Sequence, residues 1–111
     1  MKALKKAARK LLLELGAPVS SKGFNYTVEV LADAIANEKP IVNGSKLTQE
    51  WGAKFGERAG LIDRNLRYVK DVCIEKQTDK FNEIFGNADG IKLYEFLGIL
   101  RYRLEDEVEG M

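Results

Sequence analysis

Apolar residues recur at helical spacing along most of the chain, and residues that end helices separate the runs. The first run predicts a helix that stops at Gly16, with Pro18 beyond it. Its apolar positions are Leu4, Ala8, Leu11, Leu12 and Leu15. The second run predicts a helix with Asn25 or Thr27 as its N-cap. Its apolar positions are Phe24, Val28, Leu31 and Ile35.

The middle of the chain predicts two helices joined by a tight turn. EKPIVNGS is expected to be a connector, followed by a helix over about 45–55 in which Thr48 caps the last two turns. Gly56 ends that helix, and a longer helix over about 59–76 follows. Its apolar positions are Ile62, Leu66, Val69 and Cys73. These positions lie on one face, so Arg64 points almost directly away from the core.

The last third predicts two more helices. Thr78 or Asp79 is expected to cap a short helix that ends at Gly86, and a longer helix covers about 91–108. The apolar positions of that longer helix are Leu93, Phe96, Leu97, Leu100 and Leu104. Few segments favour strands, so the predicted fold class is all-α. We expect one compact six-helix domain over 1–111 that contains a helix-turn-helix.

The helix-turn-helix prediction rests on the pattern of residues 48–70. Two helices that cross closely need a small residue at the crossing, and the turn between them often uses glycine; Gly52 and Gly56 fit these roles. The second helix of such a motif presents its exposed N-terminal half to the DNA major groove, where Arg64 and Arg67 fall. Arginine pairs bidentately with guanine O6 and N7. An adjacent acid, Asp63, can accept from cytosine or hold an arginine in one rotamer.

Composition changes this picture in two ways. The formal net charge is only +1, so total charge does not indicate a nucleic-acid binder. The charge is unevenly distributed, however: residues 1–16 carry five Lys/Arg against one Glu, whereas residues 81–111 carry three Lys/Arg against seven Asp/Glu. The acidic end therefore conceals a more basic front half.

Several functional classes lack support in the sequence. Histidine is absent, Cys73 is alone, and there is no Gly-rich phosphate loop, so we expect no enzyme, no cofactor, no metal ion and no small-molecule substrate. No apolar run approaches the length of a membrane span, and the start of the chain is too polar for a signal peptide. The sequence therefore predicts a cytoplasmic protein with no membrane partner.

A family resemblance adds to these predictions. It is carried by ELGAPVSSKGFNYTVEVLADAI at 14–35, AKFGERAGLIDRNLRYVKD at 53–71, IFG at 84–86 and EFLGILRYRL near the end. With these segments the chain from about Leu13 to Glu107 resembles the C-terminal DNA-binding effector domain of the stage 0 sporulation response regulator family. The resemblance implies a transcription regulator that acts in sporulation. Its expected partner is double-stranded DNA, bound by a homodimer or a tandem pair of domains.

The resemblance also implies roles for particular residues. Asp63, Arg64 and Arg67 match base-contacting positions, so the guanines of the family's TGNCGAA box should still be preferred. Lys54, Arg58 and Tyr68 match positions near the DNA backbone. Tyr94, Phe96 and Leu100 lie on the helix that the family uses between tandem domains.

Three departures from the family pattern leave an alternative open. Asp63 is one methylene shorter than the family's glutamate, and Glu57 and Arg58 replace small hydroxyl residues, so that Glu57 near a phosphate would repel it. No receiver domain precedes the domain, which implies either a fragment of a longer regulator or a stand-alone protein without that phospho-switch. The alternative is an interaction module of the same fold that has lost DNA binding and modulates a related regulator.

Overall fold

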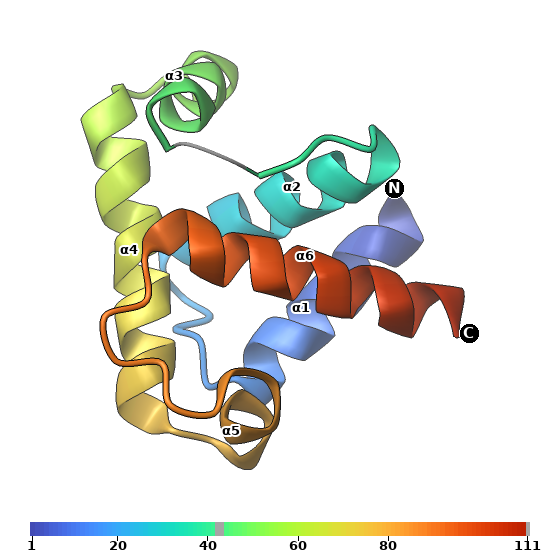
Figure 1. Ribbon diagram of the computed structural model, residues 1–111. Helices are drawn as coiled ribbons and strands as arrows, with labels where there is room; N and C mark the ends of the chain where they lie inside the picture. Colours follow the sequence, from blue (N-terminus) through green and yellow to red (C-terminus); the bar gives the residue numbers. More distant parts are fainter. Residues whose placement is uncertain (42–43, 111) are drawn as a thin grey trace.

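The structure is a computed structural model that describes residues 1–41 and 44–110, and this part of the chain forms helices joined by short loops (Figure 1). The helices are α1 (Lys2–Glu14), α2 (Lys22–Ala36), α3 (Gly44–Phe55), α4 (Ala59–Lys76), α5 (Asp79–Phe85) and α6 (Leu93–Glu109). The all-α class predicted from the sequence is confirmed. None of these helices has both the length and the apolarity that crossing a bilayer requires.

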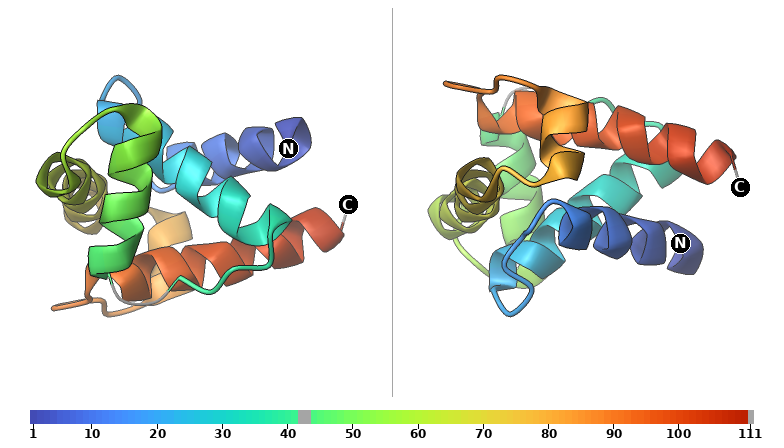
Figure 2. Two further views of the ribbon diagram at one scale, coloured as in Figure 1. Left: turned by 90° about the horizontal axis from the view of Figure 1, so that it is seen from above. Right: turned by 90° about the horizontal axis from the view of Figure 1, so that it is seen from below.

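The predicted apolar faces meet in one buried cluster. Seen from above, α2 lies between α1 and α6, while α4 stands across the end of these three helices (Figure 2). Every apolar position predicted for α4 and α6 is at most 2% exposed. The helix ends also follow the sequence: α1 stops before Gly16 and α5 stops before Gly86, both with positive φ. The core therefore fixes α4 with its apolar stripe inward and its polar face outward.

Two predicted caps are wrong. The N-cap of α2 is Ser21, whose hydroxyl accepts from the Phe24 amide at 3.2 Å, because this helix begins earlier than Asn25 or Thr27. The Thr27 hydroxyl is buried inside the helix and donates to the Gly23 carbonyl. Thr48 likewise lies within α3, where its hydroxyl donates to the Ser45 carbonyl at 3.1 Å. For α5 the sequence predicted Thr78 or Asp79 as the cap, and Thr78 is the N-cap, because its hydroxyl accepts from the Phe81 amide at 3.1 Å.

The predicted connector EKPIVNGS falls only partly within the described residues. Positions 42 and 43 lie outside them, and Gly44 and Ser45 already belong to α3. Ile41 lies on the other side of this interval and packs against the core.

Candidate nucleic-acid interface

The turn between α3 and α4 is three residues long and is closed by backbone hydrogen bonding. Gly56 has φ 68°, the left-handed conformation that ends many helices. The Glu57 amide then donates back to the Gly52 carbonyl at 2.8 Å. A Cβ on Gly52 would lie 2.6 Å from the Glu57 carbonyl oxygen, so the turn folds back directly over this glycine. Position 52 therefore needs a small residue, as predicted, although the crowding comes from the backbone of the turn rather than from a crossing of the two helices.

A second close approach fixes α4 against α2. A Cβ on Gly23 would overlap the backbone carbonyl of Asn65 and the side chain of Val69. Because only glycine permits this approach, the second turn of α4 lies directly on the start of α2. Gly23 therefore has a structural role, because this close approach determines where the exposed face of α4 lies.

Glu57 holds the turn to α2 through a pair of polar contacts. Its carboxylate accepts from the Tyr26 hydroxyl at 2.6 Å and from the Lys22 ammonium at 3.1 Å. The side chain is only 16% exposed, so its charge is directed into the protein and partly neutralised. The hydrogen bond from Tyr26, followed by that from Lys22, lowers the pKa of Glu57, which keeps this carboxylate ionised. The expected repulsion between Glu57 and a phosphate is therefore much reduced.

Aromatic rings support the same unit from inside. Phe55 stacks between Tyr26 at 4.5 Å and Trp51 at 5.4 Å, measured between ring centroids. Trp51 is 5% exposed and lies on the inner face of α3, as its apolar character predicts. The stack joins α3 to α2 beside Glu57, so the turn is held by packing as well as by polar contacts.

The outward face of α4 presents Arg64, Arg67 and Tyr68 together. All three side chains are exposed, Arg67 by 49% and Tyr68 by 51%. Within residues 1–41 and 44–110, Arg64 takes part in no salt bridge and no side-chain hydrogen bond. Its five guanidinium donors therefore face water and remain available to a ligand.

Arg67 is held in one orientation by the acid one turn before it. Its Nε donates to Asp63 Oδ2 at 2.8 Å, and this hydrogen bond is the main cause that raises the pKa of Arg67. The contact uses the side of the guanidinium and leaves the two terminal nitrogens as a fork. The sequence expectation that Asp63 could hold an arginine in one rotamer agrees with this geometry.

Two shallow hollows flank these arginines. One is lined by Arg58, Gly60, Leu61 and Arg64 at the start of α4. Arg58 is the N-cap residue of α4, and its side chain makes no cap hydrogen bond, because a guanidinium has no acceptor. The other hollow has Asp63, Arg67 and Tyr94 in its lining, together with Ser45 and Thr48 of α3.

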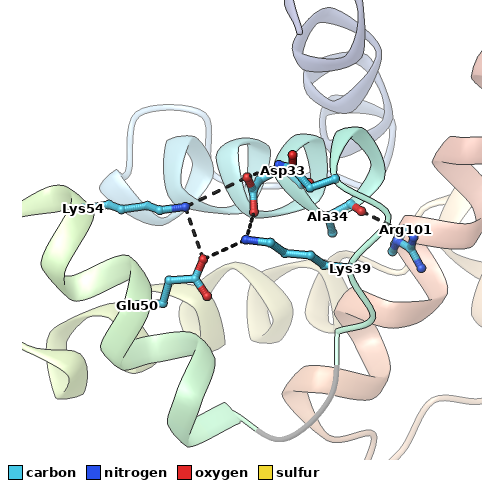
Figure 3. A network of polar contacts seen from close by, with 7 residues as sticks. Asp33, Ala34, Lys39, Glu50, Lys54 and Arg101 are labelled. Atoms are coloured by element: carbon cyan, nitrogen blue, oxygen red, sulfur yellow. Dashed lines mark hydrogen bonds and ion pairs between the residues drawn. The ribbon is translucent and has the colours of Figure 1, made fainter.

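Lys54 differs from Arg58 and Tyr68, the other residues expected near the DNA backbone, because it already forms ion pairs within the protein. Its ammonium lies 3.2 Å from Glu50 and 4.0 Å from Asp33, and Lys39 bridges the same two acids (Figure 3). It also lies 4.2 Å from the centre of the Trp51 ring. Lys54 is 44% exposed, so a phosphate could reach it only by competing with these partners.

The expectation that Phe96 and Leu100 contact a second domain is wrong. Both are completely buried in the chain's own core, so neither side chain has surface left for another molecule. Tyr94 is partly exposed, but it lines the hollow beside Asp63 and Arg67. Tyr94 of α6 therefore lies next to the exposed face of α4.

Two parts of this interface were missed by reasoning from the sequence. The Tyr26–Glu57 contact joins residues 31 positions apart, and no local pattern indicates it. Tyr94 beside Arg67 was missed for the same reason, since α6 reaches α4 through the tertiary fold. Comparison of the chain with protein-family models, curated proteins and solved structures finds no match.

Proposed function

We propose that this chain is a transcription regulator that binds double-stranded DNA sequence-specifically, with α4 in the major groove. The observation that carries the proposal is the presence of two exposed arginines on one face of α4, one without a polar partner and one held by an acid. Within the described residues Arg64 makes no polar side-chain contact. Asp63 accepts from the Nε of Arg67 and leaves the two terminal nitrogens of Arg67 available. A single bidentate arginine–guanine pair discriminates against the wrong base by about 1–3 kcal/mol.

The surroundings of α4 suit this role. The α3–turn–α4 unit has a three-residue turn that folds back over Gly52, which supports a helix-turn-helix motif. Arg58 lines a hollow with Arg64, and Tyr68 is exposed next to Arg67 in the chain; in this proposal both contact DNA phosphates. Glu57, which otherwise would oppose a phosphate, is turned toward Tyr26 and Lys22.

Selection from random DNA duplexes, followed by sequencing of the bound fraction, tests the proposal. The expected motif contains recurrent guanines at two positions. Arg64→Ala and Arg67→Ala should each relax one of them. Asp63→Glu should sharpen the motif at one position without moving its register, because the longer side chain reaches deeper into the groove. No enrichment for the wild-type protein would refute DNA reading.

The second candidate is an interaction module that has the same fold but does not bind DNA. The engagement of Lys54 by Glu50 and Asp33 favours it, since a lysine that contacts phosphate would be expected to lack other partners. This candidate predicts that the random-duplex selection returns no motif. It also predicts that Arg64→Ala leaves every binding property of the protein unchanged.

A further inference from the structure

The outward face of α6 carries acidic and apolar side chains in a single line. Glu95, Ile99, Tyr102 and Asp106 are all exposed, and their spacing of four, three and four residues places them above one another. Ile99 is 40% exposed and Tyr102 is 61% exposed. Glu109 extends the line, and within the described residues neither Asp106 nor Glu109 takes part in a salt bridge. We call these five residues the acidic stripe.

The outward face of α1 has the same spacing and the opposite charge. Lys2, Lys6, Arg9 and Leu13 are all exposed and again lie above one another; we call them the basic stripe. Leu13 is 55% exposed, unlike the other leucines of this helix. Over the described part of the chain, none of these three cations forms a salt bridge, whereas the neighbouring Lys5 is paired with Glu29 at 3.0 Å.

Each stripe lies on the side of its helix opposite the buried residues, and the two helices lie on opposite sides of the molecule. In Figure 1 α6 crosses in front of α1, and the two views of Figure 2 place these helices on opposite sides of the molecule. One copy therefore cannot join its own stripes. A second copy placed in front can offer its basic stripe to the acidic stripe of the first.

We propose that the acidic stripe of one copy docks antiparallel on the basic stripe of a second copy. In this register each residue of the basic stripe meets a suitable partner, and Glu95 extends beyond the contact: Leu13 lies with Ile99, Arg9 with Tyr102, Lys6 with Asp106, and Lys2 with Glu109. The pairs are an apolar contact, a cation–π contact and two ion pairs. The inference deepens the proposed function by naming how adjacent copies pair on DNA. The contact itself does not depend on DNA binding; only its use at adjacent DNA sites rests on the proposed function.

Charge excludes the symmetric arrangements. An acidic stripe against its own copy would place Glu95 near Asp106, and a basic stripe against its own copy would oppose lysines and arginine; both repel. The contact must therefore be head-to-tail. In such a pair, one copy keeps an unpaired basic stripe and the other keeps an unpaired acidic stripe. Two single helix faces bury less than the roughly 1,200 Å² of a stable interface, so the pairing is weak and sensitive to salt.

Charge reversal with mixing tests this arrangement without DNA. Lys6→Glu/Arg9→Glu destroys the basic stripe, and Asp106→Lys/Glu109→Lys destroys the acidic stripe, while each variant retains the other stripe. In sedimentation at low salt, each variant alone should associate at least about tenfold more weakly than the wild-type protein. An equimolar mixture should recover association, since the intact acidic stripe of one variant meets the intact basic stripe of the other. Circular dichroism checks that both variants keep their helices.

A cross-linking experiment covers the case of very weak association. Leu13→Cys and Ile99→Cys in separate chains should be joined by a short bismaleimide when mixed, whereas either variant alone should not. Lys46→Glu, which changes the charge as Arg9→Glu does but lies outside both stripes, should leave cross-linking unchanged. A mixture of the charge-reversed variants that stays monomeric, or cross-links that form equally in each cysteine variant alone, would overturn the proposal.

DNA measurements separate this inference from the proposed function. The charge-reversed variant Asp106→Lys/Glu109→Lys should bind a duplex with one site as the wild-type protein does. It should lose about tenfold in affinity for two adjacent sites, where pairing contributes. If the wild-type protein bound no DNA but the mixed variants paired in solution, the proposed function would fail and the pairing would stand.

Discussion

Arg64 and Arg67 are three residues apart on α4, yet their environments differ. Within the described residues Arg64 has no charged partner, whereas Arg67 forms an (i, i+4) ion pair with Asp63. An exposed pair of this kind contributes about 0.3–0.5 kcal/mol to stability. Removal of Arg64 should therefore affect ligand binding alone, and removal of Arg67 should also cost a small amount of helix stability.

Substitution of each arginine by alanine tests this difference. We expect Arg64→Ala and Arg67→Ala each to weaken specific DNA binding by about 1–3 kcal/mol. The free energy of unfolding should change by less than about 0.5 kcal/mol in both variants. Gel-shift titration at fixed salt measures the first quantity and urea denaturation the second. If Arg64→Ala strongly lowered stability but left DNA binding intact, the residue would be structural.

Tyr26 links stability to alkaline pH. Burial raises the pKa of its phenol to about 12, and the hydrogen bond to the Glu57 carboxylate acts in the same direction. An unfolded chain has a tyrosine pKa of about 10, so the folded state prefers the protonated phenol. The stability from this group is complete below pH 10 and is lost as pH rises toward 12.

The corresponding variant is Tyr26→Phe, which removes the ionising group but keeps the ring against Phe55. We expect a lower stability at neutral pH, because Glu57 loses a hydrogen bond, and a flatter decline between pH 10 and 12. Thermal denaturation across that range compares the two proteins. An equally steep decline in both would show that another group causes the alkaline loss.

At the scale of the elements, the α3–turn–α4 unit depends on Gly52. An added Cβ would meet backbone, the Glu57 carbonyl oxygen, and backbone cannot move away as a flexible side chain can. Gly52→Ala should therefore destabilise the protein by about 1–3 kcal/mol, the usual cost of overpacking.

Gly98→Ala in α6 is the matched control for this substitution. Its nearest neighbour would be the Ile41 carbonyl oxygen at 3.9 Å, an ordinary contact. Alanine is favoured over glycine in a helix by up to about 1 kcal/mol, so this variant should be neutral or more stable. Urea denaturation of both variants distinguishes crowding at the turn from a general effect of glycine replacement.

The helices could be predicted from the sequence because their signals are local. The apolar stripes and glycines such as Gly16, Gly56 and Gly86 lie within a few residues of the ends they determine. The caps at Asn25 and Thr48 were wrong because a hydroxyl or amide inside a helix resembles a cap in sequence. Only the backbone hydrogen bonding decides which polar residue precedes the first turn.

The site could be predicted in part. Periodicity on α4 correctly placed Arg64 and Arg67 on the exposed side. The same periodicity on α6 indicated that Phe96 and Leu100 are core, and the interface role taken from the resemblance conflicted with it. Contacts between helices, such as Asp33 with Lys54, depend on crossing geometry that no local pattern contains.

At the scale of the whole molecule, one core connects α4 to the other helices. Cys73 is completely buried in that core at the far end of the apolar stripe of α4, and desolvation raises the pKa of its thiol to about 12. The reactive thiolate is therefore scarce in the folded state at neutral pH.

The thiol can report on global opening. We expect Cys73 to react with a neutral thiol reagent only through unfolding, so its rate should follow the unfolded fraction as urea increases. Gly52→Ala should raise this rate in native buffer, and Gly98→Ala should not. Fast labelling of the native wild-type protein would mean that α4 separates from the core locally.

The aromatic stack under the turn has an optical consequence. Trp51 is the single tryptophan of the chain, and its indole contacts both the Phe55 ring and the Lys54 ammonium. A buried indole emits at shorter wavelength than a solvated one, and a nearby charge perturbs its excited state. If a DNA phosphate draws Lys54 away from Glu50 and Asp33, the ammonium leaves the ring and the emission changes. The protein thus carries its own fluorescent probe at the junction of α2, α3 and the turn. Lys54→Ala is the control, because its emission should not change on DNA binding through loss of the ammonium.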